Sequence, residues 1–495
     1  MLFNSPAYIF IFLPLVVAGY FFLNRYRLAT LARIWLLIAS LFFYAYWNPA
    51  YLPLILASIV VNYAVGTRVA QRARAELADN ALSPQSRHLL GLGILFNLAL
   101  LAYFKYADFF VDNVNLALGL EIVPLHLVLP LAISFFTFQQ IAYLVDCYRL
   151  KVDDYKFLNY CIFVTFFPQL IAGPIVHHRQ MMPQFDSRWR KLPRLRNISQ
   201  GCFIFSLGLF KKVFIADAFA IWADQGFAAE HALGPMDAWA TSLSYTFQLY
   251  FDFSAYSDMA IGAALLFNIR LPVNFNSPYK AADIRDFWRR WHISLSTWLR
   301  DYLYIPLGGS RRAAGRLYIN VLITFLLGGL WHGAGWNFLI WGGMHGGAVM
   351  LHRLWQSCGF RMPTWLGWAS TFLFVNCTWV LFRAENLDQA VRLLASMFFL
   401  TGPQISLDHA WQNPQIAYWA PEPLIGWFLV FYLLLFGFVA FKMPNALQVS
   451  GYIPYSGRFA FRRGAIAAVF IALSLFYALV ASITSVPSPF IYFNF

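Results

Sequence analysis

Long apolar runs with few charged residues recur from one end of the chain to the other. About 20 apolar residues suffice to cross the hydrocarbon core of a bilayer as a helix. Because these runs are continuous rather than alternating, they favour spanning helices over the strands of a β-barrel. The clearest runs cover residues 6–23, 34–46, 89–104, 122–145, 317–343, 424–441 and 464–484. The pattern predicts an all-α polytopic membrane protein with about nine to twelve crossings.

Charged residues alternate between the loops of the N-terminal half. Arg25, Arg27 and Arg33 follow the first apolar run, whereas the next loop, near residues 48–51, carries no charge. Loops on the cytoplasmic side of membrane proteins are enriched in Lys and Arg. We therefore expect the basic loops inside and the N-terminus outside. Since no basic residue precedes the first run, we interpret it as a retained span rather than a signal peptide.

This alternation breaks in the middle of the chain. Residues 149–156 and 179–196 both have the basic character of cytoplasmic loops, yet one crossing cannot begin and end on the same side. The segment between them, FVTFFPQLIAGPIV, contains Pro168, Gly173 and Pro174, which interrupt helices. We therefore predict a re-entrant hairpin here. Irregular backbone at membrane depth is tolerated where it is buried in protein or lines a cavity.

Composition agrees with a membrane protein. The chain is 60% hydrophobic and only 12% charged, with a mean hydropathy of +0.57. Its net charge of +14 therefore fits basic cytoplasmic loops better than a nucleic-acid partner. The five cysteines show no metal-binding or disulfide spacing. Without a visible repeat or linker, we treat residues 1–495 as a single integral membrane domain.

One stretch concentrates charge and aromatic rings: RDFWRRWHISLSTWLRDYLY, from Arg285 to Tyr304. On a continuous helix one face would carry Arg285, Arg289, His292, Ser296 and Arg300, with tryptophans on the neighbouring face. Such a cationic face suits an anionic ligand or lipid phosphates, although an interfacial helix anchored by aromatic residues also fits. Neighbouring cations favour the neutral imidazole of His292, which can accept a proton. The candidate ligand-binding residues are Arg285, Arg289, Arg290, Arg300, Trp288 and Trp291.

A second stretch, LLGGLWHGAGWNFLIWGGMHGG, places His332 and His345 in an apolar run. No Asp, Glu, Lys or Arg occurs between Arg316 and Arg353. Ionisable residues within spans are costly and tend to mark function. Glycines surround His332, which permits tight helix packing or close approach of a ligand. A hydrogen-bonded packing histidine is the alternative, and for His345 it is the preferred interpretation.

These two stretches resemble the histidine motifs of the membrane-bound O-acyltransferase family. The match is to the bacterial branch that contains the alginate O-acetylation membrane protein and the D-alanyl transfer protein of teichoic acid synthesis. The resemblance extends to LPLAISFFTFQQIAYLVDCYR, FFPQLIAGPI, QLYFDFSAYSDMAIG and LPVNFNSPY, and so covers nearly the whole chain. The alginate-type proteins look closer than the D-alanyl ones.

The resemblance implies acyl transfer from a cytoplasmic donor, with acetyl-CoA expected, to an extracytoplasmic polysaccharide such as alginate. It implies a ring of spanning helices with re-entrant helices around a funnel, in the bacterial inner membrane. His332 matches the catalytic histidine, and His292 lines the same funnel. We expect His332 to act as general base and His292 to orient the donor or stabilise the developing oxyanion. We include Trp331 and Trp336 among the donor-binding residues. No metal or tightly bound cofactor is expected.

Several alternatives stay open at this point. The resemblance also implies a periplasmic partner enzyme of the SGNH type, because no such domain is visible in this chain. A D-alanyl or peptidoglycan-type enzyme with a carrier-protein donor is one alternative. A transporter or flippase is another, since it too would combine broken helices with membrane histidines. A covalent acetyl-histidine intermediate is also compatible with the residues.

Other charged residues have structural interpretations. Asp252 and Asp258 lie six positions apart, so on a helix they point in different directions, and we expect buried carboxylates bonded to Tyr, Ser or Arg. Lys211 and Lys212 are expected to pair with such carboxylates or to extend towards a membrane interface. FRAENL suggests an ion pair between Arg383 and Glu385 at a helix end. We assign acceptor or partner specificity to residues 402–423 as a hypothesis.

Overall fold

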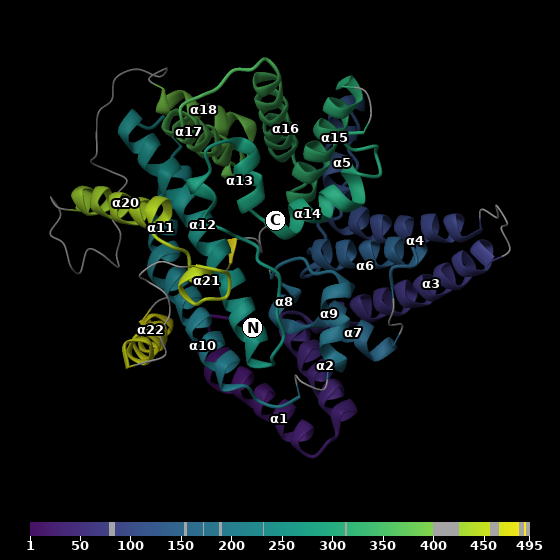
Figure 1. The fold of residues 1–495 in the computed structure, drawn as a ribbon. Coiled ribbons are helices and arrows are strands. Elements are labelled where there is room, and N and C mark those ends of the chain that lie inside the picture. The colour runs from purple at the N-terminus through teal and green to yellow at the C-terminus, as the bar shows by residue number, and fades with distance from the viewer. Residues whose placement is uncertain are drawn as a thin grey trace. The chain divides into compact units, whose positions relative to one another are not determined.

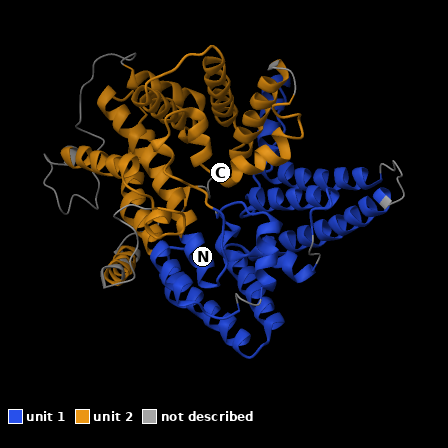
Figure 2. Ribbon diagram, in the orientation of Figure 1, with its two compact units in different colours: residues 1–205, 259–272 blue, residues 206–258, 273–495 orange. Residues whose placement is uncertain are grey.

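The chain is helical throughout the part that the structure describes. The computed structural model describes residues 1–78, 85–152, 156–171, 173–187, 191–230, 232–311, 314–398, 425–455, 465–484 and 490–491. These residues form helices and connecting loops, with no β-strand among them (Figure 1). They divide into two compact units, residues 1–205 with 259–272 (unit 1) and residues 206–258 with 273–495 (unit 2) (Figure 2). The predicted all-α class is confirmed, and treatment as one domain stays a prediction.

Each unit is a set of packed helices. The helices mostly in unit 1 are η1 (Ala7–Phe12), α1 (Leu13–Arg25), α2 (Ala29–Ala45), η2 (Pro49–Tyr51), α3 (Leu52–Ala78), α4 (Gln85–Leu101), η3 (Ala102–Tyr106), α5 (Ala107–Leu118), α6 (Ile133–Tyr148), α7 (Phe157–Thr165), α8 (Phe167–Leu170), α9 (His178–Asp186) and α10 (Leu195–Phe210). Those mostly in unit 2 are η5 (Lys211–Ala216), α11 (Asp217–Phe227), α12 (Pro235–Leu266), η6 (Pro278–Lys280), α13 (Ile284–Arg290), α14 (Ile293–Leu299), η7 (Arg300–Tyr304), α15 (Ala314–His332), α16 (Trp336–Ser357), α17 (Thr364–Arg383), α18 (Leu387–Met397), α20 (Ile425–Lys442), α21 (Ala446–Val449) and α22 (Ala465–Thr484).

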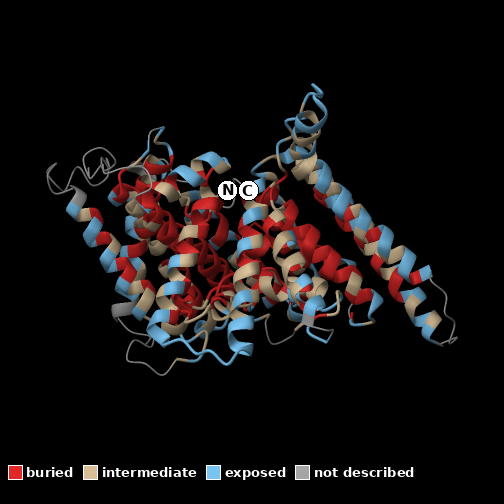
Figure 3. Ribbon diagram, turned by 90° about the horizontal axis from the view of Figure 1, so that it is seen from above, coloured by how far each residue is buried: buried red, intermediate tan, exposed pale blue. Residues whose placement is uncertain are grey.

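Several of these helices have the length and surface of membrane spans. Four stretches of the described chain are long and apolar enough to cross a bilayer: Ala7–Arg25, Pro49–Leu77, Gln85–Leu118 and Thr364–Arg383. Exposed residues alternate with buried ones along the helices (Figure 3), and many exposed residues of these four stretches are large and apolar, such as Leu15 at 60% exposure. Such extensive apolar surface is unusual on a soluble protein and fits contact with lipid. The chain is a polytopic membrane protein, and the exact number of crossings stays a prediction.

Polar side chains hold apolar helices together inside unit 1. Asn62 on α3 donates to Gln140 on α6 and exchanges hydrogen bonds with Asn97 on α4. Ser58 donates to the same Gln140 oxygen at 2.8 Å. All four side chains are buried. Because lipid tails offer no hydrogen-bond partners, such contacts favour association of helices within a membrane.

Two of the predicted apolar runs do not form single helices. In the run 122–145, helix α6 begins only at Ile133, and the preceding described residues 120–130 are not helical. Pro124 and Pro130 lie there, and proline lacks the N–H that a helix interior requires. The run 317–343 is divided between α15, which ends at His332, and α16, because a turn at residues 333–335 reverses the chain. The predictions of continuous helices are wrong at these two places.

The predicted interruption near Pro168 is confirmed. Helix α7 ends at Thr165, Phe166 has φ −49° and ψ 106°, and the single turn α8 follows. Pro168 lies in the first turn of α8, where its missing N–H would be unpaired in any helix. Every described residue from 159 to 176 is buried. The broken helices are therefore enclosed by protein, and their entry into the membrane from one side stays a prediction.

Candidate active site

The basic and aromatic stretch forms two short helices rather than one. Helix α13 ends at Arg290, and α14 begins at Ile293. Between them Trp291 is extended, with φ −94° and ψ 130°, and His292 adopts a left-handed conformation with φ 41°. The continuous helical face predicted for the arginines, His292 and Ser296 is therefore wrong. The left-handed region costs a residue with a side chain about 1–2 kcal/mol, so surrounding contacts must hold it.

A neighbouring segment supplies those contacts. The N–H of Asn276 donates to the carbonyl of Arg290 at 2.9 Å, and the N–H of Ile293 donates to the carbonyl of Asn274 at 2.9 Å. Through these two bonds, the backbone groups on each side of the break are paired with residues outside the helices. At the other end of α13, the Asp283 side chain accepts from the backbone N–H groups of Arg285 and Asp286. The break is thus a hydrogen-bonded structure with His292 at its centre.

His292 is completely buried. Its Nδ1 lies 3.1 Å from Oδ1 of Asn274. Its ring contacts Phe253, with centroids 4.9 Å apart at 87°, and Phe275, with centroids 6.3 Å apart. Burial in this apolar pocket lowers the pKa of His292 to about 3. The imidazole is therefore neutral near pH 7, as predicted, but burial rather than neighbouring arginines is the main cause.

Glycine packing positions His332 at the tip of a helical hairpin. Helices α15 and α16 lie side by side, joined by the turn at residues 333–335. A Cβ on Gly329 would stand 2.2 Å from the Phe338 carbonyl oxygen, and one on Gly342 would stand 2.3 Å from the Phe325 carbonyl oxygen. These two helices can approach so closely only because both positions lack side chains. His332 is the last residue of α15, where the chain turns.

His332 lies in an aromatic enclosure and is only 3% exposed. Its ring centroid is 5.2 Å from that of Trp341, 5.2 Å from that of Phe382 and 5.0 Å from that of Trp331. The centroids of His332 and His292 are 6.4 Å apart, and Trp331 contacts both rings. Unit 2 therefore brings together the two histidines and one of the predicted tryptophans.

A cavity of about 320 Å³ reaches His332 from the side of α13 and α14. Trp288, Ser296, Gly328 and Trp341 contribute to its walls. Its basic lining residues are Arg285, Arg289, Arg300 and Arg353. Arg285 donates to Gln356 at 3.0 Å, and Arg300 lies 2.7 Å from Asp301. Arg289 and Arg353 form no ion pair within the described part of the chain. The cavity combines cationic groups with a buried histidine, which suits an anionic ligand with a reactive end.

Four predicted ligand-binding residues lie outside the lining of this cavity: Arg290, Trp291, Trp331 and Trp336. Trp331 instead contacts the rings of both histidines. Arg290 pairs with Asp286 at 2.9 Å within α13. Trp291 is buried and packs its ring 4.9 Å from that of Trp379. Trp336 is 52% exposed at the start of α16. The structure thus groups Arg285, Arg289, Arg300 and Trp288 with His332. Arg290 instead forms an ion pair within α13, and Trp291 packs against Trp379.

His345 has the environment of a packing histidine. It is completely buried, and its Nε2 lies 3.0 Å from Oγ1 of Thr378. The Thr378 hydroxyl donates to the Val375 carbonyl, so it accepts from the His345 N–H. The ring packs against Trp341 at 4.7 Å and Trp288 at 5.2 Å. It does not line the cavity of His332.

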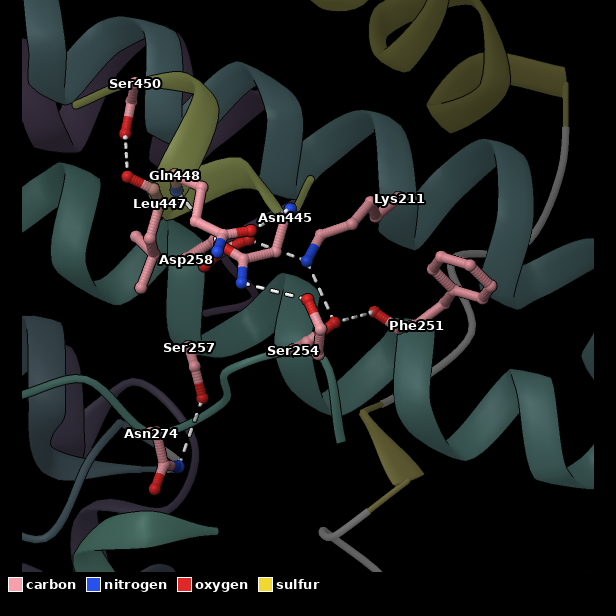
Figure 4. A network of polar contacts seen from close by, with 11 residues as sticks. Lys211, Phe251, Ser254, Ser257, Asp258, Asn274, Asn445, Leu447, Gln448 and Ser450 are labelled. Atoms are coloured by element: carbon pink, nitrogen blue, oxygen red, sulfur yellow. Dashed lines mark hydrogen bonds and ion pairs between the residues drawn. The ribbon is translucent and has the colours of Figure 1, made fainter. Parts of the chain in front are cut away.

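The two lysines at the start of η5 pair with carboxylates of α12. Lys211 Nζ lies 2.6 Å from Asp258 (Figure 4). Lys212 Nζ lies 2.9 Å from Asp252 and 2.8 Å from Asp217. The predicted pairing of the lysines is confirmed, and Asp252 and Asp258 are buried structural carboxylates as expected. Their principal partners are lysines, where tyrosine, serine or arginine had been predicted.

The predicted ion pair between Arg383 and Glu385 is wrong. Arg383 at the end of α17 lies 2.9 Å from Asp224 on α11. Glu385 follows the end of α17, and its backbone N–H donates to the Gln389 side chain. Residues 402–423, to which specificity had been assigned, lie outside the described residues. That assignment stays a prediction.

Sequence reasoning missed three residues of the site and a second cavity. Asn274 occurs in the quoted LPVNFNSPY, but nothing in that motif indicates contact with His292. Arg353 and Trp341 join the cavity only through the hairpin, which the expected continuous span obscured. A larger cavity of about 780 Å³ lies at the loop between α16 and α17, and its lining includes neither His292 nor His332.

Known proteins provide the remaining evidence. The membrane-bound O-acyltransferase family matches residues 51–387. The chain is 51% identical over 439 residues to a peptidoglycan O-acetyltransferase of Helicobacter pylori, covering 83% of this chain and 81% of that protein. It is 44% identical over 407 residues to the probable alginate O-acetylase AlgI of Azotobacter vinelandii, covering 80% and 78%. A teichoic acid D-alanyltransferase of Bacillus subtilis is 27% identical over 230 residues, covering 45% and 58%.

The expectation that the alginate-type proteins are closer than the D-alanyl ones is confirmed by these identities. The family match covers both histidine stretches, and therefore the cavity that reaches His332. The helices, the apolar surfaces and the sequence matches agree with one another. The chain belongs to the membrane-bound O-acyltransferase family and is an acyltransferase of membranes.

Proposed function

We propose that this protein transfers acetyl groups from a cytoplasmic thioester donor, acetyl-CoA, for O-acetylation of an extracytoplasmic polysaccharide such as alginate. The single observation that carries the proposal is that one cavity is lined both by four arginines and by the buried His332. We place the protein in the inner membrane of a bacterium. The relatives named as O-acetyltransferases support an acetyl group as the cargo.

The arginines of the cavity suit the phosphates of coenzyme A. Guanidinium groups bind phosphate oxygens through paired, charge-assisted hydrogen bonds. Arg289 and Arg353 carry most of this role, because Arg300 is partly neutralised by Asp301 and Arg285 is bonded to Gln356. Trp288 adds an aromatic wall to the same cavity. We propose that these residues hold the donor with its thioester directed towards His332.

His332 supplies the proton chemistry. In the proposed step its neutral imidazole takes the proton of the acceptor hydroxyl while the oxygen attacks the thioester carbonyl. The carbon–sulfur bond then breaks, and the protonated imidazole returns the proton to the leaving thiolate. The products are the acetyl ester and free coenzyme A. An acetyl-histidine intermediate would use the same residue in two successive transfers, and the two routes differ in whether acetyl-enzyme accumulates.

The acceptor side of the proposal rests on similarity. Relatives carry names that specify alginate and peptidoglycan, so an extracytoplasmic glycan is the proposed acceptor class. The resemblance to the alginate-type proteins supports a partner enzyme, and we propose a separate periplasmic SGNH-type transferase in this role. In that arrangement the membrane protein moves the acetyl group across the bilayer, and the partner attaches it to the polymer.

The proposal is tested in proteoliposomes of known protein orientation. Labelled acetyl-CoA is supplied on the cytoplasmic side, and labelled ester is measured on the other side with alginate or peptidoglycan fragments, with and without the partner. Acetylated glycan that forms only with acetyl-CoA on the cytoplasmic side supports the proposal. Turnover with an acylated carrier protein and not with acetyl-CoA would favour the D-alanyl-type alternative. Movement of intact acetyl-CoA or glycan without ester formation would favour a transporter.

A further inference from the structure

The contacts of His292 decide between the two roles that its sequence left open. We propose that Asn274 is a positioning residue that holds His292 in the tautomer protonated on Nδ1, so that Nε2 accepts a hydrogen bond from an O–H or N–H group of a substrate. In this tautomer His292 orients a substrate and cannot donate to an oxyanion. The role in catalysis rests on the proposed acetyl transfer, whereas the tautomer itself does not.

The orientation of the Asn274 amide is determined by an obligatory donor. The backbone N–H of Ser294 lies 3.3 Å from Oδ1 of Asn274, and the Ser294 hydroxyl donates to the same oxygen at 2.8 Å. A backbone N–H cannot accept a hydrogen bond, so the oxygen end of the amide must face Ser294. The other end, Nδ2, donates to the hydroxyl of Ser257 at 3.3 Å (Figure 4). The Ser294 N–H therefore assigns the oxygen end of the amide, and the hydroxyl of Ser257 is a compatible partner for Nδ2.

The tautomer of His292 follows from that orientation. The same Oδ1 lies 3.1 Å from Nδ1 of His292. An amide oxygen has no hydrogen to donate, so Nδ1 must carry the proton for this bond to form. In a neutral imidazole the second nitrogen then carries only a lone pair. Nε2 of His292 is buried and forms no hydrogen bond with any residue that the structure describes.

The environment keeps the ring neutral. His292 is fully buried, and its ring neighbours are Phe253, Phe275, Trp331 and His332. Burial lowers the pKa of His292 to about 3. A second proton on Nε2, which would make this atom a donor, is therefore disfavoured at pH 7. Nε2 remains a buried acceptor close to His332, and a polar substrate group is its natural partner.

The segment that carries Asn274 is anchored at several points. The Asn274 carbonyl accepts from the Ile293 N–H, and the Asn274 side chain reaches Ser257 on α12. Ser257 adjoins Asp258, which is paired with Lys211 (Figure 4). The amide is thus held between a helix fixed by a buried ion pair and the break between α13 and α14. Such support is what a side chain needs to hold a tautomer through repeated turnover.

Nuclear magnetic resonance tests the tautomer without any assay of activity. The protein is labelled with ¹⁵N-histidine in lipid bilayers, and the signals of His292 are identified by their loss in His292→Gln. We expect a protonated Nδ1 and an unprotonated Nε2 in the wild type and in Asn274→Asp, whose carboxylate still accepts from Nδ1. Asn274→Ala should lose the single Nδ1–H form. A protonated Nε2 in the wild type would overturn the proposal.

Kinetics test what the tautomer does. Asn276→Ala is the matched control, because its side chain bonds to Asn445 and not to His292. We expect Asn274→Ala to lower kcat/KM by at least about 100-fold, the lower range for a positioned catalytic group, with the control and Asn274→Asp within about 10-fold of the wild type. Melting temperatures measured in parallel show whether each variant is folded. Equal losses in Asn274→Ala and Asn276→Ala would contradict a positioning role.

The same kinetic measurements also identify the substrate group that donates to Nε2 of His292. A higher KM for acetyl-CoA in acceptor-free thioester hydrolysis would assign the hydrogen bond to an amide N–H of the donor. A loss seen only when the glycan acceptor is present would assign it to a hydroxyl of the acceptor. A wild type without any turnover of acetyl-CoA would reject the proposed acetyl transfer, and the resonance experiment would still decide the tautomer.

Discussion

The imidazole rings of His292 and His332 lie with their centroids 6.4 Å apart, although one marks the break after α13 and the other ends α15. Trp331 contacts both rings. Only His332 lines the arginine cavity, whereas His292 is enclosed by phenylalanines and bonded to Asn274. The two histidines are therefore neighbours with different environments, and different roles follow from them.

The arginines of the cavity should govern affinity for the donor. We expect Arg289→Ala and Arg353→Ala each to raise KM for acetyl-CoA by about 10-fold, because a hydrogen bond to a charged group contributes about 1.5–3 kcal/mol. The kcat should change little, since neither residue contacts the reacting atoms in the proposed complex. Steady-state kinetics in detergent at low ionic strength provide the measurement.

Arg290→Ala is the control for this experiment. Arg290 belongs to the same helix as Arg289 but pairs with Asp286 and lies outside the cavity lining. Its substitution should leave KM for acetyl-CoA within about 2-fold of the wild type, because Arg290 does not line the cavity and an ion pair near the surface typically contributes only about 0–1 kcal/mol. Equal effects at Arg289 and Arg290 would show that general charge, rather than the cavity, attracts the donor.

The hairpin of α15 and α16 should depend on the absence of a side chain at Gly342. A Cβ there would lie 2.3 Å from the Phe325 carbonyl oxygen, so Gly342→Ala must separate the two helices. We expect a loss of about 1–3 kcal/mol of stability, the usual cost of overpacking, and a matching loss of activity because His332 ends α15. The melting temperature of the purified protein measures the first effect.

Gly347→Ala is the matched control on the same helix. Nothing lies within 4 Å of a Cβ built at Gly347, and alanine is a better helix former than glycine. We expect this variant to melt at or slightly above the wild-type temperature. If both variants were equally destabilised, close contact between the helices would not be the reason for glycine at Gly342.

The buried ion pairs of η5 should matter far more than an exposed one. Lys212 contacts Asp252 and Asp217, and Lys212→Met would leave both carboxylates without this cation. Breaking a buried pair on one side typically costs about 3–5 kcal/mol. Lys156→Met removes an ion pair with Asp186 whose lysine side chain is 64% exposed, and should cost at most about 1 kcal/mol. Chemical denaturation in detergent would compare the stabilities of Lys212→Met and Lys156→Met. Similar losses of stability in the two variants would contradict this account.

The buried His292 should also contribute to the loss of stability in acid. Its pKa is lowered to about 3 by burial, whereas an unfolded histidine titrates near about 6.5. Between these two pH values the unfolded chain binds a proton that the folded protein does not, so stability falls as pH decreases. We expect the melting temperature of His292→Gln to fall less steeply than that of the wild type between pH 7 and pH 5. If the melting temperatures of the two proteins fell in parallel with pH, His292 would not contribute to the loss of stability in acid.

The sequence predicted much of this architecture because lipid imposes a simple pattern. Continuous apolar runs indicated the helices, and Pro168 indicated the interruption after α7. The helix break at Trp291 and His292 was not predictable, because it depends on hydrogen bonds with Asn274 and Asn276, which lie earlier in the chain. Local periodicity describes neighbours along a helix and contains no information about such partners.

In the site, too, some features were predictable from the local sequence and others depend on tertiary contacts. His292 and His332 were identified as candidates because ionisable residues are unusual in apolar surroundings. Their proximity depends on the turn at residues 333–335, which ends α15 and places His332 at its tip. An apolar run conceals such a turn, since glycines occur both in turns and in closely packed helices. Arg353 and Asn274 became site residues only through tertiary contacts.

The most direct test of the central claim measures donor binding and turnover in the same samples of wild type, His332→Ala and His345→Gln. His345 is the control, because it is a buried histidine of the same hairpin that lies outside the cavity and bonds to Thr378. We predict that all three bind acetyl-CoA with similar Kd. His332→Ala should lose at least about 100-fold in kcat, and His345→Gln should keep most of it. Wild-type turnover in His332→Ala would contradict the account.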